Sequence, residues 1–395
     1  MTAHVPSRRP EVGAPRVLVV VNDAAFFLTH RLSLAQGVRA AGFDVHVATP
    51  PDDVSPRIEA EGFPFHPFPL SRRGTSPAGE LKTLTALTKL YRELSPDVVH
   101  HVTAKAILYG GVAARIARVP AVVHAVSGLG YVFISKDARA RVLRRAIRTT
   151  YRLATSHPNC AVIFQNDDDR MTFGSAIRTP RVVMIRGSGV DLKRFQHAPL
   201  PHGVPVVVLP SRMLWDKGIG EFAAAARILR TRGVLARFAL VGGVDPGNPA
   251  AVPRERIEQW VAEGAVEWWG LRADMPAVLA SSTIVCLPSY REGMSKALLE
   301  ACAVGRPIVT TDVPGCRDVV AGGDHGVLVP ARDASALSDA LAKLLPDRAR
   351  LEHMASSAAQ AARSRFGVEH VVEQTLDLYR ALLPGVRPVG PRRPT

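Results

Sequence analysis

Apolar runs of strand length alternate with amphipathic stretches of helix length along almost the whole chain. Near-continuous apolar strands separated by helices are typical of a parallel β-sheet covered by helices on both faces. The predicted strands are 16–22, 43–49, 97–102, 120–126 and 160–165, then 205–210, 236–242, 283–288, 307–311 and 326–330. Because this scheme occurs twice in 395 residues, the sequence predicts an α/β protein with two doubly wound, Rossmann-like domains.

The predicted domain boundaries follow this pattern and the composition of the segments between the blocks. Residues 16–198 form the predicted N-terminal domain and 199–366 the C-terminal domain, with a hinge in the Pro-rich segment 196–205. The helix expected at 367–384 is a candidate to cross back onto the first domain. The two ends are expected to be a disordered lead and a disordered tail, residues 1–15 and 385–395.

The compartment can be inferred from what the sequence lacks. No apolar run approaches the ~18–20 residues of a membrane-spanning helix. The basic residues near the N-terminus precede no apolar core, so we expect no secretory signal. The four cysteines have no Cys-x-x-Cys spacing and are expected to be buried, reduced thiols. These features predict a cytoplasmic protein.

The formal net charge of +15 is unevenly distributed. Residues 1–200 carry 27 Lys and Arg against 15 Asp and Glu, whereas residues 201–395 carry 23 against 20. The excess of positive charge therefore belongs to the first half of the chain. Such an asymmetry predicts a negatively charged partner, which could be membrane lipid, a diphosphate-linked substrate or nucleic acid.

The segment 289–311 carries the most specific chemistry. A strand at 283–288 leads into a helix opened by Gly293, and backbone amides at the positive end of a helix favour phosphate. The amides expected to face this ligand belong to Gly293, Met294, Ser295 and Lys296. Glu292 and Glu300 are eight positions apart, or ~12 Å along a helix, and carboxylates accept hydrogen bonds from hydroxyls. Phosphate plus hydroxyls describes a nucleotide-sugar. The alternative is that Glu292 caps the helix and Glu300 is solvated.

Two further elements follow strands of the second domain. Arg212 and Lys217 lie just after the strand at 205–210, where they could neutralise a nucleoside diphosphate leaving group. The alternative is a solvated turn whose Asp216 caps the next helix. Gly242 and Gly243 follow the strand at 236–242 and would let the backbone approach a nucleotide closely.

Taken together, these elements resemble those of the retaining glycosyltransferases of family four. The matching elements are Ser211-Arg212, Asp216-Lys217-Gly218, Pro288-Ser289, Glu292-Gly293 with Glu300, and Gly305-Arg306-Pro307. The resemblance implies the GT-B fold, in which two such domains face a central cleft. It further implies that Glu300 binds the ribose and Glu292 the donor sugar, while Arg212 and Lys217 hold the diphosphate.

The first half also resembles this family, in particular a subgroup that builds bacterial surface polysaccharides and lipid-linked glycans. The Gly-Gly pair that often follows the first strand is absent here, and the strand instead leads into 22–31. Asn22, His30 and Arg31 are candidates to line the cleft on the acceptor side. By resemblance, His124 ends a strand against the donor sugar, and Gly128 belongs to the loop beside it. A strand-end His taken alone is more often structural.

The expected reaction follows from this resemblance. It is the transfer of a hexose or N-acetylhexosamine from a UDP-sugar to a lipid-linked glycan or polysaccharide precursor, with retention of anomeric configuration. We expect no cofactor and no metal, since no Asp-x-Asp stands at a credible strand end and the acidic run 167–169 is typical of a helix N-cap cluster. The alternatives are a non-hydrolysing nucleotide-sugar epimerase on the same fold, or a catalytically inactive module that binds nucleotide-sugar or polyanion.

The segment 136–154 predicts a basic amphipathic helix. At 100° per residue one stripe of this helix is formed by Arg141, Arg144, Arg145, Arg148 and Arg152. One interpretation turns this stripe toward anionic lipid of the inner leaflet, which suits an acceptor carried on a polyprenyl diphosphate. A solvated face is the plainer alternative. Nucleic acid is not expected, because no aromatic platform or known module accompanies the arginines. The sequence does not predict an oligomeric state.

Overall fold

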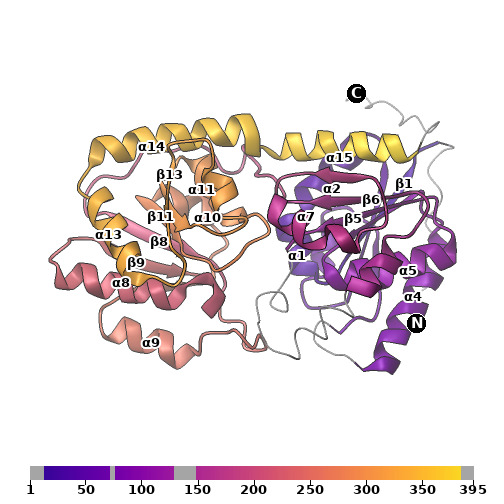
Figure 1. Cartoon of the computed structure of the whole chain (residues 1–395), viewed down its shortest axis with the longest axis horizontal. Helices are drawn as coiled ribbons and strands as arrows, with labels where there is room; N and C mark the ends of the chain where they lie inside the picture. The colour runs from indigo at the N-terminus through magenta and orange to yellow at the C-terminus, as the bar shows by residue number, and fades with distance from the viewer. Residues whose placement is uncertain (1–12, 72–75, 129–147, 384–395) are drawn as a thin grey trace. The chain divides into compact units, whose positions relative to one another are not determined.

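The computed structural model describes residues 13–71, 76–128 and 148–383, which divide into two compact units (Figure 1). Unit 1 contains the chain up to Ile185 and again from Val371, and unit 2 is the continuous segment Arg186–His370. The sequence placed the boundary after residue 198. The contacts divide the chain earlier because Val190 and Phe195 are buried in the core of unit 2.

Unit 1 is built on a parallel sheet of seven strands in the order β3-β2-β1-β4-β5-β6-β7. The strands are β1 Arg16–Val21, β2 Asp44–Thr49, β3 Phe65–Pro67, β4 Val98–Val102, β5 Ala121–Val126, β6 Cys160–Phe164 and β7 Val182–Met184. The helices are α1 Ala24–His30, α2 Leu32–Ala40, α3 Pro56–Ala60, α4 Pro77–Leu94, α5 Ala104–Ala117, α7 Asp167–Phe173 and α15 Val368–Leu382, with a further described helical stretch at 148–154.

Helices cover both faces of this sheet (Figure 1). One face packs against α1, α2 and the part of α15 that belongs to unit 1, and the other packs against α4, α5 and the stretch 148–154. Strand β4 shows the alternation directly. His100 points to the α15 face and contacts Tyr379, whereas His101 points to the α4 face and contacts Tyr91. Both faces of the strand are therefore buried, as a parallel sheet requires.

Unit 2 repeats this architecture with six parallel strands in the order β10-β9-β8-β11-β12-β13. The strands are β8 Val206–Pro210, β9 Arg237–Val241, β10 Glu267–Gly270, β11 Ile284–Leu287, β12 Ile308–Thr311 and β13 Gly326–Val329. The helices are α8 Ile219–Thr231, α9 Arg254–Ala262, α10 Met275–Ala280, α11 Lys296–Val304, α12 Arg317–Val320, α13 Ala334–Leu344 and α14 Arg348–Ala361. A 3₁₀ turn, η3 Trp215–Lys217, precedes α8. Two doubly wound parallel-sheet domains were predicted, and the structure confirms them.

Four structural findings bear on chemistry. Within the described ranges, no helix combines the length and the apolar character needed to cross a membrane. The same ranges contain no group of three or more His, Cys, Asp or Glu side chains placed to hold a metal ion. The four cysteines are buried and form no disulfide, as predicted. The acidic run 167–169 occupies the first turn of α7, whose N-cap is Asn166.

Candidate functional site

The carboxyl ends of β8, β9 and β11 meet at one edge of the unit 2 sheet. Two glycines permit this close approach. A Cβ on Gly242, whose φ is 151°, would lie 1.8 Å from the carbonyl oxygen of Ser211. A Cβ on Gly218, whose φ is 73°, would lie 2.2 Å from the carbonyl oxygen of Pro288. Side chains would force these turns apart, so the glycines let three strand ends form one site.

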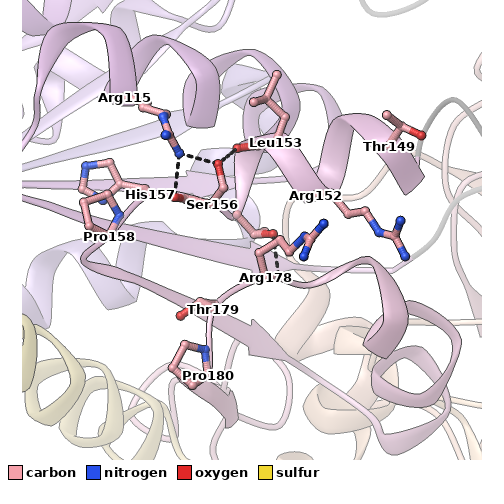
Figure 2. A pocket seen from close by; sticks show the side chains of 11 residues that line it. Arg115, Thr149, Arg152, Leu153, Ser156, His157, Pro158, Arg178, Thr179 and Pro180 are labelled. Atoms are coloured by element: carbon pink, nitrogen blue, oxygen red, sulfur yellow. Dashed lines mark hydrogen bonds between the residues drawn. The ribbon is translucent and has the colours of Figure 1, made fainter.

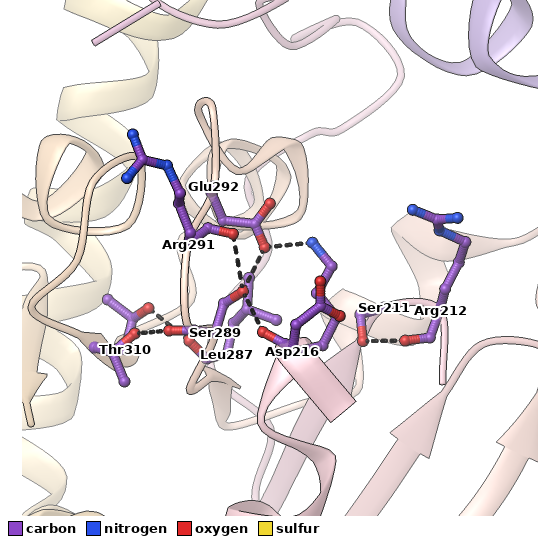
Figure 3. Close-up of polar contacts among 10 residues, drawn as sticks. Ser211, Arg212, Asp216, Leu287, Ser289, Arg291, Glu292 and Thr310 are labelled. Atoms are coloured by element: carbon purple, nitrogen blue, oxygen red, sulfur yellow. Dashed lines mark hydrogen bonds and ion pairs between the residues drawn. The ribbon is translucent and has the colours of Figure 1, made fainter. Parts of the chain in front are cut away.

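Glu292 lies at the centre of this edge, in the turn between β11 and α11 (Figure 3). Its Oε1 accepts hydrogen bonds from Lys217 Nζ at 2.5 Å and from Ser289 Oγ at 2.8 Å. The Glu292 and Lys217 side chains are 14% and 18% exposed, so solvent screens this ion pair only in part. The structure therefore joins two of the predicted site residues, which come from different turns, through one carboxylate oxygen.

Ser289 and its neighbours hold the Glu292 turn in place. The side chain of Ser289 is buried, its backbone carbonyl accepts a hydrogen bond from Thr311 Oγ1, and Thr310 Oγ1 donates to Leu287 O at 2.6 Å (Figure 3). The backbone amide of Tyr290 also donates to Asp216 O at 2.8 Å. No role was predicted for the hydroxyls of Thr310 and Thr311, although these residues end a predicted strand beside the site. Such a strand-end position is the signal that could have identified them.

The second predicted carboxylate has its own partner. Glu300 Oε1 accepts from Lys296 Nζ, one helical turn earlier on α11, and the Glu300 side chain is 11% exposed. Helix α11 begins at Lys296, so Gly293 and Met294 lie in the preceding turn and Glu300 lies one turn inside the helix. The ~12 Å of helix predicted between the two carboxylates is therefore wrong, because Glu292 lies four residues before α11 begins. The Ser295 amide is already engaged, since it donates to Gly315 O at 3.2 Å.

Arg212 and the double glycine lie at the ends of β8 and β9. The Arg212 Nη1 donates to Asp245 Oδ2 at 2.9 Å, and the Arg212 side chain is 55% exposed. Gly243 accepts from the Met213 amide at 3.0 Å through its carbonyl. Asp245 was not among the predicted site residues, although it follows the double glycine by only two positions.

These contacts show what the edge can do chemically. Three cations, Arg212, Lys217 and Lys296, each bind one carboxylate within the unit itself. A ligand bearing phosphates would compete with these carboxylates for the same donors, and a ligand bearing hydroxyls could bind the carboxylates instead. The cations at this edge can therefore exchange their carboxylate partners for ligand phosphates, and the carboxylates can accept from ligand hydroxyls.

In unit 1, Asn22 lies directly after β1 and lines a pocket of about 390 Å³. The pocket is lined by Asn22, Asp23, Pro50, Pro51, Asp52, Leu70 and Ser71. Asp23 caps α1 by accepting from the Phe26 amide at 2.7 Å. At the carboxyl ends of β1 and β2 the lining combines polar side chains, two of them carboxylates, with Pro50, Pro51 and Leu70, which suits the hydroxyls and the apolar face of a sugar.

His124 does not occupy the predicted strand-end position, and this part of the prediction is wrong. It is the fourth residue of the six in β5, and its side chain is fully buried. Its Nδ1 lies 3.2 Å from His101 Nδ1 and its Nε2 lies 3.2 Å from the Ala154 carbonyl oxygen. Burial lowers the pKa of His124 to about 4, so the ring is neutral in the folded protein. Ser127 and Gly128, which has a φ of 120°, follow the strand instead.

The other two residues predicted to line the cleft are His30 and Arg31. His30 stacks on Phe26 with ring centroids 4.2 Å apart, and its Nδ1 lies 2.7 Å from Thr29 Oγ1. Arg31 is 3% exposed at the junction of α1 and α2, and its Nε lacks a hydrogen-bond partner among the described residues. Burial lowers the pKa of Arg31 to about 10. The environment of Arg31 is therefore interior, not an open surface.

Part of the predicted basic helix is described. Arg148 and Arg152 are exposed in the helical stretch 148–154, while Tyr151 and Ala154 are buried. The amphipathic pattern therefore holds for this stretch. Arg141, Arg144 and Arg145 lie outside the described residues.

Two family comparisons cover most of the chain. Residues 16–166 match the family described as glycosyl transferase 4-like, and residues 204–347 match the family described as glycosyl transferases group 1. The second match contains the whole edge built around Glu292, and the first contains the pocket beside Asn22.

Two curated relatives are similar over most of their length. One is the N,N'-diacetylbacillosaminyl-diphospho-undecaprenol alpha-1,3-N-acetylgalactosaminyltransferase of Campylobacter jejuni, 26% identical over 90% of this chain and 96% of the relative. The other is the UDP-Gal:alpha-D-GlcNAc-diphosphoundecaprenol alpha-1,3-galactosyltransferase of Escherichia coli, 25% identical over 78% of this chain and 81% of the relative.

Solved structures resemble the fold. HepE of Anabaena, crystallised with UDP-glucose, superposes with a TM-score of 0.76 at 21% identity and covers 93% of this chain and 99% of its own. WaaG, involved in lipopolysaccharide biosynthesis, superposes with a TM-score of 0.70 at 17% identity over 94% of this chain and all of its own. These similarities identify the two-domain architecture as the GT-B fold.

Proposed function

Because this chain belongs to glycosyltransferase family four, with a 4-like domain followed by a group 1 domain, we propose that it transfers a sugar from a UDP-sugar to a glycan carried on a polyprenyl diphosphate. Two observations outside the family match support this proposal. The relatives from Campylobacter and Escherichia coli are named for acceptors on undecaprenyl diphosphate, and the Escherichia coli relative is named for UDP-Gal. A hexose or N-acetylhexosamine is the class of sugar we propose.

The observation that carries the proposal is the edge of unit 2 on which Glu292, Lys217 and Ser289 converge. In the proposed complex the donor diphosphate lies against Lys217 and Arg212, which release their carboxylate partners. Glu292, freed from Lys217, accepts hydrogen bonds from hydroxyls of the donor sugar. Glu300 does the same for the ribose. The positions of Gly242 and Gly243 at the end of β9 let the nucleotide approach the backbone.

The proposed reaction proceeds with retention of anomeric configuration. The bond between the anomeric carbon and the diphosphate oxygen breaks as the acceptor hydroxyl attacks from the same face. The departing phosphate oxygen takes the acceptor proton. Lys217 and Arg212 stabilise the negative charge that develops on this leaving group. Two side-chain cations thereby do what a metal does in other transferases, so we propose that activity requires no metal.

The acceptor is assigned to unit 1, which carries the excess of positive charge. We place the acceptor sugar in the pocket beside Asn22, where Asp23 and Asp52 are the carboxylates that would accept from its hydroxyls. The exposed Arg148 and Arg152 continue the predicted basic stripe and suit an anionic membrane surface. We therefore propose a protein of the cytoplasm that is peripherally bound to the inner leaflet.

The reaction class is tested by a screen of UDP-sugar donors that is run once with the acceptor and once without it. Each UDP-sugar is incubated with the purified protein and a pool of lipid-diphosphate-linked glycans, and the masses of the products are measured by mass spectrometry. We expect the acceptor to gain the mass of one sugar with one donor. We also expect Glu292→Ala to abolish this gain and Glu255→Ala, an exposed acid on α9, to leave it unchanged. Conversion of the UDP-sugar without any acceptor would support an epimerase and contradict the proposal.

Three measurements test the finer statements. The anomeric coupling constant of the product, measured by NMR, should match that of the donor, and an inverted product would contradict retention. Turnover should persist after exhaustive treatment with EDTA. Replacing Arg144, Arg145 and Arg148 with Gln should weaken binding to vesicles that contain anionic lipid, and unchanged binding would contradict the membrane assignment.

A further inference from the structure

Tyr290 lies two residues before Glu292 and is held at both of its ends by one segment of unit 2. Its backbone amide donates to Asp216 O at 2.8 Å, and its phenol Oη donates to Glu221 Oε1 at 2.7 Å. In the chain Lys217 lies between these two acceptors. One side chain therefore ties together the two turns from which Lys217 and Glu292 form their ion pair.

The hydrogen bond of the phenol is costly to lose. Glu221 belongs to the first turn of α8, and its other carboxylate oxygen, Oε2, is buried without a hydrogen-bond partner among the described residues. Burial and the hydrogen bond to Glu221 raise the pKa of Tyr290, so the phenol keeps its proton and donates at neutral pH. A hydrogen bond to an ionised acceptor is stronger than one between neutral groups, which makes this contact a firm tether.

The ring of Tyr290 is held by a third segment. Arg332 follows β13, and its guanidinium carbon lies 4.5 Å from the centroid of the Tyr290 ring. Arg332 has a φ of 63°, in the left-handed region, which residues other than glycine adopt at an energetic cost. A cation over the face of an aromatic ring is a favourable contact. The ring is therefore fixed by side chains as well as by the backbone of its own turn.

The proposed chemistry makes this arrangement matter for the transfer. Lys217 must reach the leaving diphosphate while Glu292 accepts from the donor sugar, so the spacing of their turns decides whether both contacts form in the transition state. We propose that Tyr290 is a positioning residue whose phenol sets the spacing between the turns that carry Lys217 and Glu292. This inference rests on the proposed function and adds to it a residue that acts through Lys217 and Glu292, not by contact with substrate.

Steady-state kinetics of the full-length protein with a UDP-sugar and acceptor test this role. Tyr290→Phe removes only the phenol oxygen and should lower kcat at least about tenfold, because a small misplacement of reacting groups is costly. The KM for the UDP-sugar should change less than about threefold, since an interaction that acts mainly in the transition state affects kcat.

Variants of Glu221 test whether the phenol acts through this carboxylate. Glu221→Ala should lower kcat as Tyr290→Phe does, and the double variant should be no slower than either single variant. Glu221→Gln should retain more of the parent's kcat than Glu221→Ala, because its amide oxygen still accepts from the phenol.

The matched control removes a hydroxyl in the other unit. Ser156 lines a pocket of about 810 Å³ in unit 1, and its Oγ accepts from Arg115 Nη1 at 2.6 Å (Figure 2). Ser156→Ala deletes a hydroxyl that bonds to a charged side chain, as Tyr290→Phe does, and should leave kcat and KM unchanged. Thermal unfolding of each variant establishes that it is folded.

The ion pair gives a second readout that needs no turnover. A double-mutant cycle with Lys217→Met and Glu292→Gln, measured by urea unfolding, gives the coupling between these side chains. The coupling should be smaller in the Tyr290→Phe background and unchanged in the Ser156→Ala background. A parent that transfers no sugar would contradict the proposed function, while the cycle would still test the tether. The inference is overturned if the coupling is the same in both backgrounds, or if folded Tyr290→Phe keeps the kcat of an active parent.

Discussion

The exchange of partners at Lys217 leads to a counterintuitive prediction for Glu292→Gln. In the ligand-free protein Lys217 Nζ lies 2.5 Å from Glu292 Oε1, and both side chains are less than one-fifth exposed. A donor diphosphate that binds Lys217 competes with that carboxylate for the same ammonium group. Replacing the carboxylate by an amide should therefore make Lys217 more available to UDP.

The magnitude follows from the charge that is lost. An amide still accepts a hydrogen bond from the Lys217 ammonium group, but the attraction of the carboxylate charge, about 1 kcal/mol for such an ion pair, is removed. Since 1.4 kcal/mol is tenfold in affinity, the Kd for UDP should fall about fivefold. Turnover should nevertheless fall by about 10²-fold or more, because the amide is a poor acceptor for hydroxyls of the reacting sugar.

Calorimetry with UDP and steady-state kinetics on the same preparation measure both effects. Glu300→Gln is the matched control, since it makes the same chemical change on a carboxylate assigned to the ribose. It should weaken UDP binding. If UDP binds Glu292→Gln as weakly as it binds Glu300→Gln, or no more tightly than it binds the parent, Lys217 does not exchange partners as argued.

Three further predictions concern buried positions. Arg31→Met should stabilise the protein by up to about 3 kcal/mol, because burial lowers the pKa of Arg31 to about 10, far below its usual range; urea unfolding measures this, and a less stable variant would refute it. His124 has its pKa lowered from 6.5 to about 4, so its neutral ring favours folding above pH 6.5 and this contribution is lost as the pH falls toward 4. In His124→Gln the unfolding temperature should therefore fall less between pH 6.5 and pH 4 than in the parent, and turnover should be retained. A loss of turnover in a folded His124→Gln variant would support a catalytic role for His124. Gly242→Ala should weaken UDP binding at least about tenfold, because the new Cβ would lie 1.8 Å from Ser211 O; unchanged calorimetry would contradict the proposed strand-end packing.

The parts of the fold that the sequence predicts well are the central strands. Strands β1 and β11 are apolar on both faces because helices cover both sides of each sheet, and such runs are visible in sequence. Strands β3, β7 and β10 were not predicted. They lie at the edges of the two sheets, have four residues or fewer, and contain residues that are partly or largely exposed. An edge strand needs less apolar sequence, so its signal is weak.

The site shows the same division between local and non-local information. The order of Arg212, Lys217, Glu292 and Glu300 along the chain was enough to propose a donor edge. The contact between Lys217 and Glu292 was not predictable, since these residues are 75 positions apart and meet only when β8 and β11 become neighbours. His124 was misplaced for a different reason. The resemblance to the family placed it at a strand end, but the structure buries it inside β5 beside His101.

The path of the chain through the two units has a consequence for synthesis. Unit 2 is an insertion in unit 1, since the first unit resumes at Val371 and ends its described part in α15. Leu376, Tyr379 and Leu382 of this helix are buried among residues of β1, β2 and β4. A ribosome that has released the first half of the chain has therefore not yet released the helix that covers one face of its sheet. Unit 2 is formed by one continuous stretch of the chain. The sheet of unit 1, in contrast, is not covered on this face until α15 has been synthesised.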